Sequence, residues 1–433
     1  MPRHLLVCHK ISQAIIKYMQ KRLQSIMSQT SSPNVRPKYS SQFWLMFVGM
    51  VISSTGTTMI WPFLTVYASD RLSMPLAAIM GLMSFNSIAG VVSSVLAGVL
   101  ADRFGRKNIM VVGLIGAAMV YAGYMFATAY WHFVVLLICA GLFSPLYRVG
   151  TDVTVADVVA PEQRTQAYSI IRMGRNIGVA LGPILGGLVL SKSYNIGFIS
   201  AASALLVYGF IVIIFLKETL VSTQAKENLR QQLAIYKEAL QNPRFSWMVV
   251  SFTLMEIASS VIWVMLAVHM KNNFGLGEEI YSRIPTTNAL MVIFLQVVVT
   301  RLMRRWRDTQ VMPWGAAFYP VSMVIIAFSK GFWGFWLGMV VLTFGELIVS
   351  PTASAYIANL APVEKRGRYL GMFSLTWPLA MAVGPLVGGY LSDNVSISAP
   401  WLAAAVTGVL AVLSYWGLDR YNQKTRIESI VKE

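Results

Sequence analysis

Charged side chains are scarce in this chain of 433 residues. They account for 12% of its residues, whereas they account for about 25% in an average soluble domain. Because so few charges cannot cover a soluble surface with polar groups, the composition excludes an ordinary soluble protein. Hydrophobic residues make up 56% of the chain, and we therefore expect an integral membrane protein.

Cysteine is nearly absent as well. Cys8 lies in the N-terminal tail and Cys139 inside an apolar run, so the two are expected in different environments, and neither a disulfide nor a metal site is predicted. The sequence contains no Walker-type phosphate-binding loop, so ATP is not expected to be the direct energy source. It also offers neither a nucleophile with its base nor a soluble domain, which argues against an enzyme or a membrane sensor. No cofactor is predicted.

Long apolar segments, by contrast, are abundant. A bilayer core of about 30 Å needs roughly 20 apolar residues per helix, and twelve segments meet that length. We predict an all-α integral membrane protein with twelve transmembrane helices in two six-helix bundles. The predicted spans are residues 43–68, 76–101, 108–128, 132–157, 166–190, 196–216, 245–270, 283–303, 310–329, 332–357, 367–391 and 397–417.

Basic residues predict the orientation of these helices, because Lys and Arg accumulate in short cytoplasmic loops. With both termini in the cytoplasm, most of the 35 basic residues fall in inner segments. Only Arg71, Lys192, Lys271, Arg283 and Lys330 fall in outer ones. The net charge of +17 is then explained by loops that face an anionic leaflet, and no nucleic-acid partner is predicted. We expect a monomer in the cell membrane, with the bacterial cytoplasmic membrane favoured.

Polar intervals predict the domain boundaries. The predicted domains are an N-terminal cytoplasmic tail at 1–40, bundles at 41–216 and 245–417, a cytoplasmic linker at 217–244 and a C-terminal cytoplasmic tail at 418–433. Within the linker, Leu229, Leu233, Tyr236 and Leu240 share one face of a predicted surface helix, which ends at Asn242-Pro243.

The N-terminal tail leaves two interpretations open. It lacks the long apolar core and cleavage site of a secretory signal. Residues 5–26 mix basic and apolar side chains at helical spacing, which fits a helix lying on the inner membrane surface. The alternative is that translation begins at Met27.

The two halves of the chain share a motif. GVALGPILGG at 178–187 recurs as AMAVGPLVGG at 380–389, and the two copies fall in the fifth and eleventh predicted spans. A second match precedes them, because Ala160-Pro161 parallels Ala361-Pro362. Nearly equal offsets indicate an internal duplication, which is typical of transporters that rock two halves about a central site.

A further motif, GVLADRFGRKN at 98–108, lies in the predicted loop between spans two and three. It matches the signature of the major facilitator superfamily, which the chain resembles over nearly its whole length after about residue 40. The resemblance implies a latch that holds the two halves together, with Asp157 as the partner of Arg106. The latch residues of the motif are Gly98, Asp102, Arg103, Gly105, Arg106 and Lys107.

The simpler alternative is a basic cytoplasmic loop that has no role as a latch. It explains the cations of the motif but leaves Gly98, Asp102 and Gly105 without a reason. The equivalent loop of the second half, residues 296–310, lacks both glycines and the early acid. The latch is therefore expected on one side only.

The repeated glycine motif also resembles the fifth-span pattern of the drug:proton antiporter branch of that superfamily. The matching residues are Gly178, Gly182, Pro183, Gly186 and Gly187, with Gly384, Pro385, Gly388 and Gly389 in the second copy. In the first copy three glycines recur every fourth residue, so they form a groove for close helix approach, and the proline removes a hydrogen bond. We expect a bendable seam between the two halves; the alternative is static small-residue packing.

Ionisable residues inside membrane spans are costly and mark function by default. Glu256 in span seven and Glu346 in span ten lie near the predicted bilayer centre, where desolvation favours protonation and hydration on the other side favours release. Similar acids occur in proton-coupled exporters of the resembled branch. We predict that both serve proton coupling and cation recognition, and the alternative is a structural pair with an arginine such as Arg148.

Three arginines lie within or near the spans. The resemblance implies that Arg148 in span four assists proton transfer, although a salt bridge with Asp152, one turn away, is equally open. Arg172 and Arg175 lie close to the inner leaflet, where snorkelling is the simpler interpretation.

Aromatic side chains complete the predicted site. Trp61, Tyr147, Trp263 and Trp377 lie well inside spans that carry a motif or a charge, and their faces attract cations. Together with the resemblance, these features favour proton-coupled export of lipophilic cationic or neutral small molecules. The alternative is a sugar, metabolite or lipid carried by the same fold.

Overall fold

The structure is a computed structural model that describes residues 39–160, 163–219, 237–303, 305–362 and 366–432. The helix predicted at 5–26 lies outside this part of the chain, and so does most of the predicted linker helix. Within the described residues, twelve helices are long and apolar enough to cross a membrane. The prediction of twelve spans is confirmed.

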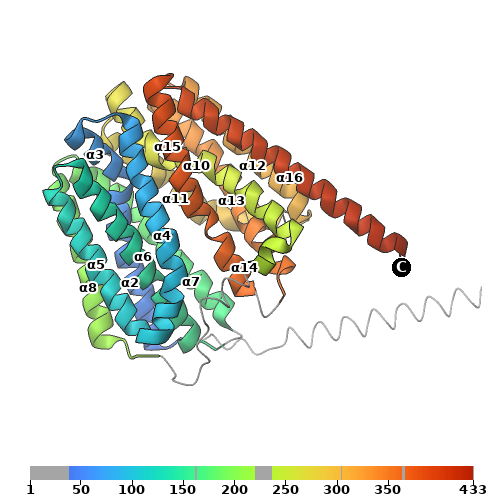
Figure 1. The fold of residues 1–433 in the computed structure, drawn as a ribbon, viewed down its shortest axis with the longest axis horizontal. Helices are drawn as coiled ribbons and strands as arrows, with labels where there is room; N and C mark the ends of the chain where they lie inside the picture. Colours follow the sequence, from blue (N-terminus) through green and yellow to red (C-terminus); the bar gives the residue numbers. More distant parts are fainter. Residues whose placement is uncertain (1–38, 161–162, 220–236, 304, 363–365, 433) are drawn as a thin grey trace, which may run out of the picture. The chain divides into compact units, whose positions relative to one another are not determined.

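The first six spans form the N-terminal half, coloured blue to green in Figure 1. Its elements are α2 (Ser41–Ile60), η1 (Trp61–Phe63), α3 (Leu64–Leu72), α4 (Leu76–Phe104), α5 (Arg106–Gly123), η2 (Tyr124–Phe126), α6 (Tyr130–Val158), α7 (Arg164–Leu190) and α8 (Tyr194–Phe215). Pro62 explains the 3-10 turn η1 inside the first span, because it cannot donate the usual backbone hydrogen bond.

The other six spans form the C-terminal half, coloured yellow to red in Figure 1. Its elements are α10 (Pro243–Phe274), α11 (Glu278–Met303), α12 (Asp308–Phe328), α13 (Phe332–Leu360), α14 (Arg366–Phe373), α15 (Thr376–Asn394) and α16 (Ala399–Lys432). Asn242 caps α10, since its side-chain oxygen accepts the N–H groups of Arg244 and Phe245.

Two predicted boundaries differ from the structure. The eleventh span is interrupted between α14 and α15, where Pro378 cannot donate to the carbonyl one turn earlier. The predicted C-terminal tail at 418–433 is not a separate segment in its described part, because α16 continues without a break to Lys432. Lys and Arg in this last stretch are good helix formers, so the helix can extend beyond the membrane.

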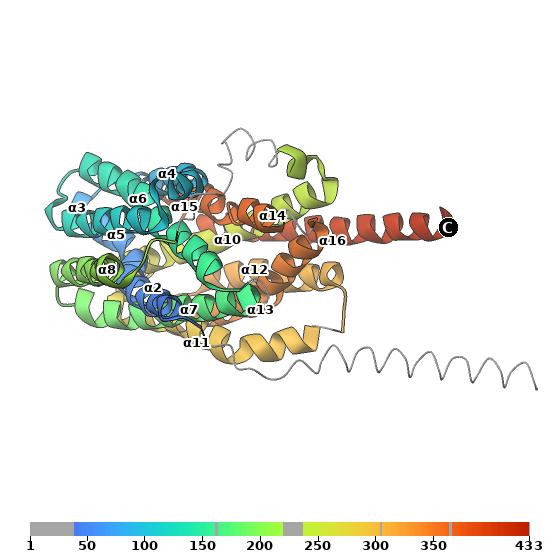
Figure 2. The same cartoon turned by 90° about the horizontal axis from the view of Figure 1, so that it is seen from below.

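The two halves pack their helices in the same way. In the N-terminal half α2 packs against α7 and α8, and in the C-terminal half α10 packs against α15 and α16. Between the halves, α4 lies against α15 and α7 lies against α11, as Figure 2 shows. This repeated arrangement agrees with the duplication inferred from the glycine motif.

Candidate functional site

An acidic cavity of about 250 Å³ lies within the C-terminal half. It brings together four predicted residues that are distant in sequence, namely Glu256 and Trp263 on α10, Glu346 on α13 and Trp377 on α15. The remaining lining residues are Ser259, Tyr319 and Ser350. The cavity therefore combines two carboxylates with aromatic faces, the groups that recognise and neutralise a cation.

The two carboxylates have different partners. The Asn288 amide on α11 donates to Oε2 of Glu346 at 2.9 Å and to Oγ1 of Thr343 at 3.0 Å. The Thr343 hydroxyl donates in turn to the backbone carbonyl of Met339, so its oxygen is free to accept from the amide. These hydrogen bonds orient the Asn288 amide so that it donates to the Glu346 carboxylate, which acts as an acceptor.

Glu256 has no equivalent donor. It is 9% exposed, and within the described part of the chain it forms neither a hydrogen bond nor an ion pair. The two acids are equivalent in the sequence pattern, and a role for Asn288 was not predicted. An amide inside the apolar run of the eighth span was the available signal, because a polar side chain in a span finds a partner on another helix.

The arginines predicted within or near the spans, Arg148, Arg172 and Arg175, belong to the N-terminal half. Arg172 on α7 is exposed, and its charge acts on Glu346 across the two halves. Arg148 on α6 is also exposed and forms no ion pair with Asp152 in the described structure. The charges of Arg175 and Arg148 both act on Asp152, and the Arg175 Nε is buried without a hydrogen-bond partner among the described residues.

The other two aromatic candidates lie elsewhere. Trp61 is half-buried in η1 and Tyr147 is buried in α6, and neither lines the acidic cavity. Both belong to the N-terminal half, whereas every residue that lines the cavity comes from the C-terminal half.

The residues of the predicted latch form a polar network around Arg106, which is 3% exposed. Its guanidinium contacts Asp102 at 3.1 Å and Asp157 at 3.2 Å, so the structure joins the pair that the resemblance implied. Thr219, after α8, donates its hydroxyl to the same Asp157 carboxylate at 2.8 Å. The exposed Arg103 instead lies over the ring of Phe104.

A further acid in this network was not predicted. Glu218 accepts the backbone N–H groups of Arg106 at 3.0 Å and Lys107 at 3.2 Å. It therefore sits at the N-terminus of α5, where the helix dipole favours a negative charge. All these partners of Arg106 and Lys107 belong to the N-terminal half, so the network does not bridge the halves through the contacts that the structure describes.

The two glycines of this motif differ in role. Gly105 has a φ of +94°, a conformation that only glycine adopts without strain. Gly98 lies inside α4, and a Cβ built there would meet no atom within 4 Å. Gly105 therefore permits the turn between α4 and α5, whereas Gly98 takes no part in it.

The glycine motif of α7 also corrects an expectation. A Cβ at Gly178, Gly182 or Gly186 would collide with α2 of the same half. Gly187 alone points to the other half, where a Cβ would lie 2.5 Å from Oγ of Ser282. The face formed by these three glycines therefore packs within one half, because α2 lies against it.

The second copy of the motif repeats this division. Gly384 and Gly388 pack against α10 and the neighbouring chain of their own half, whereas a Cβ at Gly389 would lie 2.8 Å from Cα of Ala77 in α4. The last glycine of each copy is thus the one at the interface between halves. Pro183 and Pro385 lie inside their helices beside these contacts.

Polar contacts between the halves gather at the end of the helices that the charge pattern predicts to face outwards. Lys271 on α10 binds Asp70 of α3 at 2.6 Å and Glu278 at 2.8 Å, and Tyr194 of α8 donates to Glu278 at 2.7 Å. Asp393 on α15 accepts the N–H groups of Leu76 and Ala77 at 3.0 and 2.7 Å. We call Asp70, Tyr194, Lys271, Glu278 and Asp393 the outer clasp.

The outer clasp was missed by the sequence analysis. Lys271 was assigned only to an outer segment, and the acids near it were not assigned a role. Their pairing depends on which span ends meet across the halves. Asp393 in particular caps the N-terminus of α4 from the other half, as a side-chain cap does within one chain segment.

Comparison with known proteins covers almost all of the chain. Residues 46–258 and 248–432 match the family profile of the Major Facilitator Superfamily. A Na(+), Li(+), K(+)/H(+) antiporter of Planococcus maritimus is 25% identical, with 78% of this chain and 87% of the relative covered. The quinolone resistance protein NorA of Staphylococcus aureus is 24% identical, with 86% and 96% covered.

Solved structures show the same fold. The crystal structure of a mutant form of the nucleoside transporter NupG superposes with a TM-score of 0.74 at 14% identity, covering 87% of this chain and all of that one. At this identity the likeness bears on the fold alone.

Proposed function

Because this chain belongs to the Major Facilitator Superfamily and is a membrane transporter of that type, we propose that it is a proton-coupled antiporter. It exports lipophilic small molecules, cationic or neutral, and exchanges them for protons. Both termini face the cytoplasm of a bacterial cell, and the monomer is the transporting unit. Its own residues need no cofactor for this exchange.

The acidic cavity carries the proposal. Two carboxylates from α10 and α13 share about 250 Å³ with Trp263 and Trp377. Carboxylates that are charged and close to one another repel, so binding of one proton or one cation relieves the repulsion. A site of this kind is stable when it holds a proton or a cationic substrate, and the empty site is unfavourable. Exchange of one for the other requires this condition.

The unequal partners of the two acids assign them different tasks. The amide of Asn288 donates to Glu346 at 2.9 Å, and such a bond stabilises a charged carboxylate. Glu346 therefore anchors the cation. Glu256 lacks a donor within the described structure and is buried, so it is the acid that takes up and releases the proton.

An arginine of the N-terminal half connects this chemistry to movement. The charge of Arg172 acts on Glu346 from the opposite half. When the halves move relative to each other, this attraction changes, and the preference of Glu346 for a cation changes with it. Arg148 on α6 instead acts on Asp152 and Arg175 of its own half.

The outer clasp and the latch hold the two ends of the transporter in turn. In the structure, the outer clasp ties the halves together through Lys271 and Asp393. The network of Arg106, Asp102 and Asp157 is formed within the N-terminal half in this structure, and its role as a latch is to receive the other half when the cytoplasmic end closes. Alternating access then follows from exchanging one set of contacts for the other.

The relatives support export. One of them is named for quinolone resistance and another for exchange of alkali cations with protons. The second name, together with a small cavity that holds two carboxylates, favours one further candidate. Carboxylate oxygens are good ligands for hard cations, so exchange of Na⁺ or K⁺ for protons is the second candidate function.

Transport in proteoliposomes tests both candidates. Purified protein is reconstituted, an inward or outward pH gradient is imposed, and movement of lipophilic cationic dyes, quinolones, sugars, Na⁺ and K⁺ is followed with a pH indicator. We expect gradient-driven movement of the dyes, with protons moving in the opposite direction. Movement of Na⁺ or K⁺ alone would favour the second candidate, and movement of sugars alone would contradict both.

Variants of the two acids test their separate tasks. We expect Glu346→Gln to lose cation binding, and Glu256→Gln to bind the cation but not to accumulate it against a pH gradient. Glu279→Gln is the matched control, because Glu279 is an exposed acid outside the cavity. If both cavity variants kept full gradient-driven transport, the acidic cavity would not be the coupling site.

A further inference from the structure

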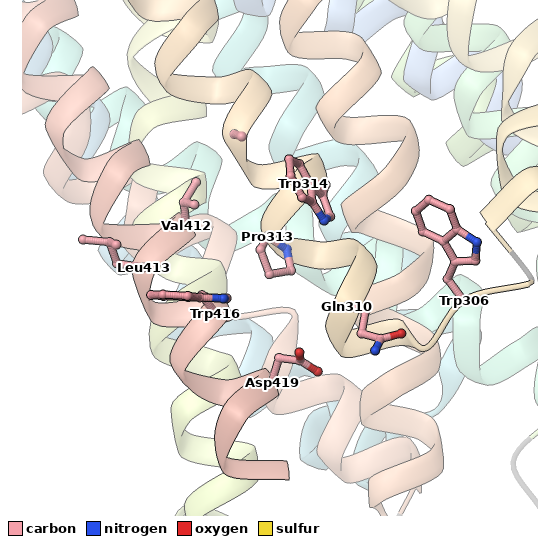
Figure 3. Close-up of a pocket in the computed structure, with 9 residues that line it drawn as sticks. Trp306, Gln310, Pro313, Trp314, Val412, Leu413, Trp416 and Asp419 are labelled. Carbon is pink, nitrogen blue, oxygen red and sulfur yellow. The ribbon is translucent and has the colours of Figure 1, made fainter. Parts of the chain in front are cut away.

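A second hollow lies outside the acidic cavity, between α12 and α16. Its volume is about 620 Å³. Figure 3 shows Trp306 and Trp314 on one wall and Leu413 and Trp416 on the other. None of these residues lines the acidic cavity, and the proposed transport cycle makes no use of them.

This groove is polar at one end and apolar at the other. Trp314 and Val412 lie towards one end, and Gln310 and Asp419 lie towards the other, as Figure 3 shows. Trp314 is 71% exposed, so its indole is available to an occupant rather than packed against protein. An occupant must therefore be amphipathic, with its polar end near the start of α12.

Asp419 is a negative charge at the polar end, but its carboxylate is directed into the protein. It is 8% exposed, and both of its oxygens already accept hydrogen bonds. One accepts from the hydroxyl of Thr309 at 2.6 Å and the other from the amide of Gln423 at 2.7 Å. These hydrogen bonds direct the carboxylate towards the protein at the contact between α12 and α16.

Three arginines outnumber the two acids at this end, Asp308 and Asp419. Arg420 lies over the ring of Trp416, with its guanidinium carbon 3.6 Å from the ring centroid. Arg305 and Arg307 flank Trp306 in sequence and are exposed. None of the three arginines is ion-paired with any residue in the described part of the chain, so each is free to bind an anion.

We propose that this groove binds an anionic phospholipid of the cytoplasmic leaflet. The phosphate contacts Arg420 and Arg307, and one acyl chain lies along Trp314 and Leu413. Three features of the groove support this occupant: unpaired arginines at one end, an apolar hollow at the other, and Trp306 just before the start of α12, since tryptophans are common at the ends of membrane spans. The stacking of Arg420 on Trp416 holds the guanidinium in place for the phosphate.

Quenching of tryptophan fluorescence by brominated lipids tests the proposal. The full-length protein is placed in nanodiscs of phosphatidylcholine that contain a small fraction of dibrominated phosphatidylglycerol or, in parallel, dibrominated phosphatidylcholine. The chain has 12 tryptophans, so the signal of interest is the quenching that Trp314→Phe removes. We expect that part to require severalfold less phosphatidylglycerol than phosphatidylcholine.

Arginine variants test the headgroup contact. Each basic residue near an anionic lipid surface contributes about 1 kcal/mol, or about fivefold in affinity. We expect Arg420→Gln to weaken the phosphatidylglycerol preference about fivefold and Arg420→Gln with Arg307→Gln to abolish it. Arg283→Gln is the control, because Arg283 is exposed and pairs with Glu279 at the other end of the helices.

Three results would overturn the proposal. One is equal quenching by both brominated lipids, which would mark an ordinary lipid-facing surface. The second is a phosphatidylglycerol preference that survives the double arginine variant. The third is dimer formation in the nanodisc that shields Trp314 from both lipids, since the groove would then belong to an interface between two copies. The same variants are also reconstituted into proteoliposomes and assayed for gradient-driven transport, so loss of folding is detected separately.

Discussion

Asn288 on α11 donates its amide to Glu346 on α13 at 2.9 Å, whereas Glu256, which lines the same cavity, has no such donor in the described structure. In the sequence the two acids are alike, since each lies in an apolar span. In the structure they differ, because only one of them has a side-chain donor. The inequality separates the holding of a cation from the carrying of a proton. Removal of a single amide is thus expected to affect both.

Asn288→Leu removes the donor without removing the acid. A hydrogen bond to a charged group contributes about 1.5–3 kcal/mol, so we expect cation binding at neutral pH to weaken at least tenfold. Binding should recover at higher pH, because the charged form of Glu346 is then restored. Binding isotherms of a fluorescent cation between pH 6 and pH 9 measure both effects. Asn422→Leu is the control, since Asn422 donates to Tyr356 and neither residue lines the cavity. An unchanged pH profile of Asn288→Leu would contradict a role for Asn288 in the site.

Asp393→Ala weakens the outer clasp. Its carboxylate accepts two N–H groups at the start of α4, and loss of such a cap costs about 0.5–2 kcal/mol. We expect the population open at the outer end to rise severalfold, and more so when combined with Lys271→Gln. Spin labels on cysteines introduced at Ser73 and Val395, with Cys8→Ser and Cys139→Ser as background, report the distance between halves. If the distribution of distances between the spin labels did not change in the double variant, the outer clasp would not stabilise the closed outer end.

Asp102→Asn weakens the latch. Arg106 is buried and keeps Asp157 as a partner, so the variant should fold. We expect the turnover rate to fall while the affinity for substrate in detergent stays nearly unchanged, because the network lies away from the acidic cavity. Lys107→Gln, which leaves the ion pairs of Arg106 intact, is the comparison. A large loss of affinity in Asp102→Asn would place this residue in the binding site and contradict a latch.

Gly389→Ala places a methyl group between the halves. Its Cβ would lie 2.8 Å from Cα of Ala77 and 2.9 Å from the carbonyl oxygen of Leu76, and backbone atoms of a packed helix yield little. We expect the variant to favour the outward-open state and to slow transport. Gly98→Ala should be tolerated, because no atom lies within 4 Å of its Cβ and alanine is favoured over glycine inside a helix by about 1 kcal/mol. Equal activity of the two variants would show that Gly389 does not limit closure.

The sequence by itself determined the number of spans, their order, the duplication and the family. These properties depend on segment length, apolar content and motif spacing, which are local or repeat at a constant offset. The sequence also singled out Glu256 and Glu346, because the cost of a charge in a bilayer is a property of one residue and its depth.

Only the tertiary structure decided which residues meet. It placed Asn288 beside Glu346 and not beside Glu256, and it joined Lys271 and Asp393 to the opposite half. It also turned most of the repeated glycines towards α2 and α10, where the sequence analysis expected the seam between halves. The reason is rotational: a helix presents each residue to one neighbour, and which neighbour stands there depends on how all twelve helices pack.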